Sequence, residues 1–113
     1  MGRAKRKKYS NFNDFVALPR KALYSKEWHE LGSAAKLLYI HLKAKYNGQN
    51  NGEICLSYSE LRGIKGISSS STISKAFYEL EKKEWITHTF MGGLFRHINK
   101  YKLTGKYDDH ISW

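Results

Sequence analysis

The chain has 113 residues, enough to bury roughly two-thirds of its unfolded surface in one domain but too few for a second core. Its single cysteine excludes an internal disulfide, and its net charge of +10 favours a polyanionic partner. No apolar run approaches twenty residues and no signal-peptide pattern is present, so we expect a cytoplasmic protein that does not enter a membrane. Cys55 stands in an apolar run, which predicts a buried thiol in a reducing compartment.

Residues 1–12 are predicted to form a flexible basic arm. Half of the net charge lies there, on Arg3, Lys5, Arg6, Lys7 and Lys8. Such an arm would gain affinity for DNA by releasing counterions from it. A solubility tail or a cloning remnant is the alternative. The cations beyond the arm still outnumber the anions, which favours nucleic acid as the partner.

The folded domain is expected to span residues 13–104. Pro19 can open a short first helix, and Ser25 is a good cap for a second helix over residues 26–31 that turns Trp28 and Leu31 inward. A longer helix over residues 34–46 has a continuous apolar stripe, made of Ala35, Leu38, Tyr39, Leu42 and Tyr46. Its lysines are expected on the surface: Lys36, Lys43 and Lys45. Glycine-rich turns then lead to a strand over residues 53–56.

The central motif is a pair of helices joined by a glycine-containing turn. Ser57 and Glu60 have the spacing of a capping box, which predicts a short helix from Tyr58 that stops at the following glycines. A second helix begins in a run of serines, where Ser68, Ser69 or Ser70 would be the cap. Two helices joined in this way form a helix-turn-helix.

The second helix of this pair is predicted to have two distinct faces. Its apolar stripe, facing a core, contains Ile73, Ala76, Phe77 and Leu80. The opposite face carries hydroxyls and cations suited to phosphates and base edges: Ser71, Thr72, Ser74, Lys75, Tyr78 and Lys82. It contains no arginine, the usual reader of guanine. The alternative is a helix whose polar face only meets solvent.

A β-hairpin is predicted after the helix pair. Residues 85–90 and 94–103 would form its strands around the turn Gly92-Gly93. The hairpin carries the cations Arg96, Lys100 and Lys102 together with His97. We interpret it as a wing, against the alternative of a sheet edge kept soluble by lysines. Residues 105–113 form a tail, in which Ile111 and Trp113 would dock either on the core or on a second chain.

These motifs together resemble bacterial and archaeal winged helix-turn-helix domains, including replication-initiator-like proteins of phages and plasmids. The resemblance covers residues 15–104, and its marks are Phe15-Val16-x-Leu18-Pro19-Arg20, Ser25-x-x-Trp28-x-x-Leu31, Ala35-Lys36 with Tyr39, Tyr46-Asn47-Gly48-x-Asn50-Asn51-Gly52, Leu56-Ser57, Ala76-x-x-x-Leu80-Glu81, Trp85-Ile86 and Tyr101-x-Leu103-Thr104. It implies an α+β fold: a three-helix core with a short N-terminal helix and a C-terminal β-hairpin wing.

The resemblance also implies a site on double-stranded DNA. The recognition helix would contact the major groove through Ser69, Ser70, Ser71, Thr72, Ser74, Lys75 and Tyr78. The wing would contact phosphate or the minor groove through Arg96, His97 and Lys100, and the arm would add its cations. The chain departs from the family in having Lys83-Glu84 where a Lys-Gly helix end is common, so either a left-handed Glu84 costs about 1 kcal/mol or the helix ends in another way.

Other functions receive less support from the sequence. The five histidines lack the spacing of metal ligands, no base is paired with the serines, and no phosphate-binding glycine loop is present, so we expect no enzyme, metal, cofactor or small-molecule ligand. A winged helix used as a protein–protein interaction module is the main alternative, with Tyr78, Tyr9, Phe12, Tyr107 and Trp113 as exposed anchors. RNA binding would need an aromatic sheet platform. A homodimer would enlarge the footprint on DNA.

Overall fold

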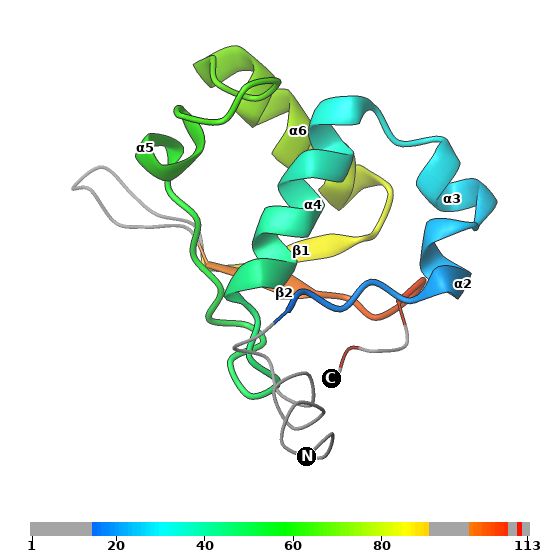
Figure 1. Cartoon of the computed structure of the whole chain (residues 1–113). Helices are drawn as coiled ribbons and strands as arrows, with labels where there is room; N and C mark the ends of the chain where they lie inside the picture. Colours follow the sequence, from blue (N-terminus) through cyan, green and yellow to red (C-terminus); the bar gives the residue numbers. More distant parts are fainter. Residues whose placement is uncertain (1–14, 91–99, 109–110, 112–113) are drawn as a thin grey trace, which may run out of the picture.

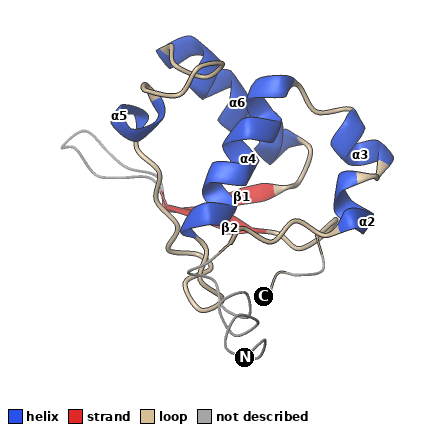
Figure 2. Ribbon diagram, viewed as in Figure 1, coloured by secondary structure: helices blue, strands red, loops and turns tan. Residues whose placement is uncertain are grey.

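A computed structural model of the whole chain describes residues 15–90, 100–108 and 111. Within these residues five helices, α2 to α6, are followed by an antiparallel pair of strands, β1 and β2 (Figures 1 and 2). α4 packs along α6, and α6 leads into β1. The helix-turn-helix and the hairpin base therefore share one core, as expected of the α+β winged helix-turn-helix fold.

The first two helices begin where local capping rules place them. Pro19 precedes α2 (Arg20–Leu23), and Ser25 precedes α3 (Lys26–His29) and accepts a bond from the Trp28 amide at 3.1 Å. Trp28 and Leu31 are buried, as the sequence predicts. Because each cap depends on neighbouring residues alone, both helix starts are predictable from the sequence.

α4 (Ser33–Lys45) is the scaffold of the domain. All five residues of its predicted apolar stripe are buried. The prediction that Lys43 lies on the surface is wrong, because its side chain is 1% exposed and its Nζ lies 2.7 Å from Asp108 Oδ2. The Tyr39 hydroxyl donates to the same oxygen at 2.7 Å. Burial lowers the pKa of Lys43, and its bond to Asp108 opposes this; burial, then Asp108, raises the pKa of Tyr39.

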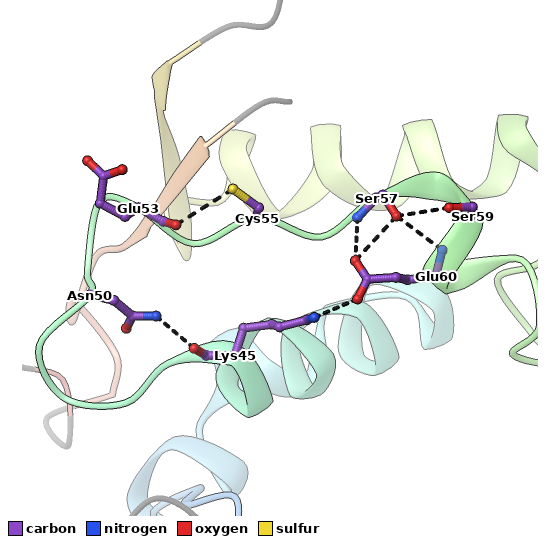
Figure 3. Close-up of polar contacts among 7 residues, drawn as sticks. All are labelled: Lys45, Asn50, Glu53, Cys55, Ser57, Ser59 and Glu60. Atoms are coloured by element: carbon purple, nitrogen blue, oxygen red, sulfur yellow. Dashed lines mark hydrogen bonds and ion pairs between the residues drawn. The ribbon is translucent and has the colours of Figure 1, made fainter. Parts of the chain in front are cut away.

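α5 (Tyr58–Leu61) has only four residues and is held by contacts at its start. The Ser57 hydroxyl accepts a bond from the Glu60 amide at 3.2 Å, and Glu60 Oε1 accepts from the Ser57 amide at 3.0 Å (Figure 3). This confirms the predicted capping box. Lys45 Nζ lies 2.5 Å from Glu60 Oε2, so the same carboxylate also joins α5 to the end of α4.

The segment before α5 differs from its prediction. Instead of a strand over residues 53–56, a single bridge joins Ile54 to Tyr101, through bonds of 3.2 and 2.8 Å. Cys55 is half-buried rather than buried, because side chains in extended backbone alternate and Ile54 and Leu56 occupy the inward positions.

α6 (Ser70–Lys82) ends in a Schellman motif with glutamate at the position that normally holds glycine. The Trp85 amide donates to the Leu80 carbonyl at 2.9 Å, and the Glu84 amide donates to that of Glu81 at 3.0 Å. Glu84 has a φ of 67°, which is the left-handed conformation foreseen as one way to end this helix.

β1 (Ile86–Phe90) pairs with β2 (Lys100–Leu103) in antiparallel register, with Ile86 opposite Leu103 and an irregularity between His88 and Phe90. The predicted turn Gly92-Gly93 lies outside the described residues. The strand pair begins directly after α6, which is the place of a wing (Figure 1).

An aromatic cluster joins three parts of the chain in the core. Trp28, Tyr39 and Trp85 pack edge to face, with ring centroids 5.1 to 5.8 Å apart. Tyr107, predicted as an exposed anchor, is half-buried with its ring 4.8 Å from that of Trp85. Ile111 is buried in the core of this chain, which decides between the two docking sites left open by the sequence; Trp113 lies outside the described residues.

Candidate nucleic-acid interface

The turn between α5 and α6 fixes the direction of α6. Ile67 is fully buried in this turn and anchors it to the core. Gly66 has a φ of 101°, and a Cβ at this position would lie 3.5 Å from the Leu37 side chain. A residue other than glycine would be strained there by its backbone rather than by lack of space. The glycine predicted to end the first helix therefore shapes the turn instead.

The serine run has been predicted both as a helix cap and as a DNA contact, and the structure assigns its members to different bonds. The Ser69 hydroxyl accepts a bond from the Thr72 amide at 3.2 Å and donates to the Thr72 hydroxyl at 2.8 Å. Ser69 is thus the cap among the three predicted candidates. Ser69 and Thr72 already have partners in the fold, whereas Ser71 and Ser74 are exposed on α6.

The exposed face of α6 carries cations, hydroxyls and an aromatic ring. Lys75 and Lys82 are exposed, and Tyr78 retains 65% of its accessible surface. The opposite stripe, which contains Ile73, Ala76, Phe77 and Leu80, is buried as predicted. α6 therefore presents one polar face outward while its other face holds it to the core.

The carboxylates of α6 bond to other parts of the fold. Glu79 Oε2 accepts a bond from the Gly32 amide at 2.8 Å, at the start of α4. Glu81 Oε2 lies 2.5 Å from His88 Nδ1 on β1 and accepts from the His88 amide at 3.3 Å. Both carboxylates are therefore bonded to other elements of the fold.

Arg62 is a candidate contact that was not predicted from the sequence. This exposed arginine follows α5, and its Nη2 donates to the Ser70 hydroxyl at 3.2 Å. Its guanidinium therefore lies beside Ser70, the first residue of α6, a helix whose own exposed face contains no arginine. The signal was its place at the end of the first helix, since a helix-turn-helix brings that end close to the start of the second.

Of the residues predicted as DNA contacts in the wing and the arm, only Lys100 is among those that the structure describes. Lys100 lies at the start of β2, with its Nζ 2.7 Å from Glu53 Oε1. This bond to Glu53 raises the pKa of Lys100. Arg96 and His97 lie outside the described residues, as do the arm residues Arg3, Lys5, Arg6, Lys7 and Lys8.

The described part of the chain offers neither a metal site nor a membrane-spanning helix. It contains no cluster of three or more His, Cys, Asp or Glu side chains that could hold a metal ion. None of the helices found there has the length and apolar character needed to cross a membrane.

The architecture of residues 29–86 decides the family. A family model for a helix-turn-helix domain matches this range, which is just over half of the chain and runs from the end of α3 to the start of β1. The chain belongs to this helix-turn-helix family. Membership indicates DNA binding. No curated protein and no solved structure gives a significant match.

Within this helix-turn-helix domain the match includes α4, α5, the glycine turn and α6. It stops at the first residue of β1, so it does not extend over the hairpin. The family match thus covers the two-helix motif, and the strand pair is described by the structure alone.

Proposed function

We propose that the protein binds double-stranded DNA in the cytoplasm, with α6 as the recognition helix in the major groove. The observation that carries this proposal is the outward face of α6, where Ser71, Ser74, Lys75 and Tyr78 are exposed while Glu79 and Glu81 bond to other elements. Arg62 adds a guanidinium beside the same face. Hydroxyls and cations on an exposed helix match base edges and phosphates.

The hairpin and the arm complete the proposed interface. Arg96, His97 and Lys100 would contact the backbone or the minor groove, and the five cations of the arm would bind phosphates outside the recognition helix. The biological role that we propose is transcriptional regulation or replication initiation, which share this fold and differ in the arrangement of their DNA sites.

Salt dependence tests DNA binding. We expect a log–log slope of affinity against salt of about −4 to −6, because some five or six phosphates would be neutralised. Lys75→Ala should weaken binding across all sequences and make the slope shallower by about 1. The matched control is Lys26→Ala, which removes another exposed cation, from α3. Unchanged binding by a chain with both Lys75→Ala and Arg96→Ala would contradict the proposed orientation.

Selection from a random duplex library at about 0.15 M salt separates the candidate roles. A palindromic motif would identify a homodimeric regulator, and tandem copies of one short motif would identify an initiator. Retention without enrichment would mean binding to phosphate alone. A chain that retains no DNA would favour the protein-interaction alternative, for which Tyr78 is an exposed anchor.

A further inference from the structure

A groove of about 230 Å³ lies between α6, the start of α5 and the strand pair. Ser74 and Tyr78 line it, and both also belong to the proposed DNA-facing surface of α6. Tyr58 contributes from α5, His88 from β1 and Tyr101 from β2. The groove therefore lies at the edge of the recognition helix, on the side of the hairpin.

The buried part of the lining of this groove is a packed aromatic layer. The rings of Phe77 and Tyr101 stack with centroids 4.7 Å apart and an interplanar angle of 12°, and both residues are buried. The His88 ring lies 4.5 Å from that of Tyr101. Tyr58 and Tyr78 line the groove above them and are 39% and 65% exposed. Exposed rings beside a packed aromatic layer offer surfaces on which a planar group can stack.

Tyr58 is held in place by the contacts that form α5. It is the first residue of this helix, directly after the capping serine Ser57, and Glu60 is bonded to both Ser57 and Lys45 (Figure 3). The backbone that carries the Tyr58 ring is therefore fixed before any ligand binds, which reduces the entropy lost on binding.

The polar groups of the groove specify what kind of planar group it suits. The Glu81 carboxylate contacts the amide and the ring of His88 through Oε2. A carboxylate oxygen accepts bonds from amino groups such as cytosine N4. Lys82 does not line the groove, but its Nζ lies 5.8 Å from the centre of the Tyr78 ring and places a cation beside it. That cation disfavours a cationic ligand and favours one that carries a phosphate.

We propose that this groove binds one unpaired nucleobase of DNA. This inference rests on the proposed function. Tyr58 and Tyr78 supply the stacking surfaces, Glu81 accepts a bond from an amino group on the base, and Lys82 contacts the adjoining phosphate. Bases that carry an amino group are preferred over thymine, because thymine has none to donate. The domain then favours DNA with a displaced base over fully paired DNA of the same sequence.

The test compares three duplexes of one sequence: fully paired, with one extrahelical cytosine, and with one abasic site at the same position. We expect the wild-type chain to bind the extrahelical cytosine roughly 5- to 150-fold more tightly than paired DNA. Tyr58→Ala should reduce this preference toward one without changing binding to paired DNA. Tyr58→Phe should keep it, because phenylalanine keeps the ring. Tyr24→Ala is the control, since it removes another exposed tyrosine, next to α2.

Each outcome supports or overturns the proposal that the groove binds an unpaired base. Equal affinity for paired and extrahelical duplexes overturns it and leaves the proposed duplex binding intact. An equal gain on the abasic duplex also overturns it, because flexible DNA would then explain the preference. Failure to bind paired DNA overturns the proposed function, and a preference for extrahelical cytosine that depends on Tyr58 would still support the groove. If Tyr58→Ala unfolds the chain, Glu81→Gln replaces it and is compared with wild type on duplexes that carry one extrahelical cytosine or one extrahelical thymine. Glu81→Gln should weaken the discrimination of cytosine from thymine, and unchanged discrimination would overturn the groove.

Discussion

Glu84 holds a backbone conformation that glycine adopts freely and other residues do not. Its φ of 67° follows from the Schellman end of α6, which requires a left-handed residue between Lys83 and Trp85. Its carbonyl accepts a bond from the Thr104 hydroxyl at 2.6 Å, and its side chain pairs with Lys106. The strained residue is thus held by bonds to the segment after β2.

We expect Glu84→Gly to be more stable than Glu84→Ala by about 1 kcal/mol in denaturant unfolding. Both variants lose the pair with Lys106, so their difference isolates the conformational preference of the backbone. Equal midpoints for the two variants would show that position 84 relaxes out of the left-handed region.

At the scale of single residues, the sequence predicts what depends on neighbours and misses what depends on distant partners. Ser25 and Ser57 were identified as caps because a helix start needs only the next three residues. Lys43 was expected on the surface because its burial depends on Asp108, 65 positions away. Arg62 was missed because its partner, Ser70, lies across a turn.

Among the elements, α5 depends most on its neighbours, because four residues cannot form a stable helix alone. Tertiary contacts stabilise this helix, since Lys45 of α4 pairs with Glu60 and Leu61 is fully buried. The bond to Lys45, followed by the bond to the Ser57 amide, lowers the pKa of Glu60 below its ordinary 4.5.

The lowered pKa of Glu60 predicts how stability depends on pH. The unfolded chain binds the proton more readily than the folded chain, so this carboxylate stabilises the fold above about pH 4.5, and its contribution is lost as the pH falls through the folded pKa. The stability difference between wild type and Glu60→Gln should therefore shrink in acid. The same comparison of Glu and Gln at position 60, made over this pH range in a chain that also carries Lys45→Ala, checks the cause. Without Lys45, the stability difference should depend less on pH. A difference independent of pH would contradict the role of this ion pair.

The sequence predicts helices better than contacts between them. All helices found in the described residues begin within one position of a predicted start, and the buried stripes of α4 and α6 follow their 3.6-residue period. The prediction of a strand over residues 53–56 was wrong because strand pairing depends on residues far away in the sequence. In this segment Ile54 alone forms a bridge, with Tyr101. The groove beside α6 was not predicted because its walls come from four elements.

On the scale of the whole molecule, the segment after β2 is part of the fold. Asp108 and Ile111 are buried, and Asp108 connects this segment to Tyr39 and Lys43 on α4. An ion pair withdrawn from water gains little net stability when complete, but loss of one partner leaves a buried charge without compensation. We therefore expect the Lys43–Asp108 pair to specify the position in which this segment docks, rather than to add much net stability.

We expect Asp108→Ala to lower the free energy of unfolding by about 3–5 kcal/mol, because it leaves the buried Lys43 ammonium and the Tyr39 hydroxyl without this acceptor. Adding Lys43→Met should restore much of the loss, since the second change removes the isolated charge and keeps an apolar side chain of similar length. Lys26→Met is the matched control on the surface, where its Nζ lies 4.0 Å from Glu30, and should change stability by less than about 1 kcal/mol. Denaturant unfolding of wild type, Asp108→Ala, Lys43→Met and the double variant gives the coupling between positions 43 and 108. Additive losses in the double variant would mean that the segment docks through its apolar contacts, with Tyr107 on Trp85 and Ile111 in the core, and that the ion pair does not determine its position.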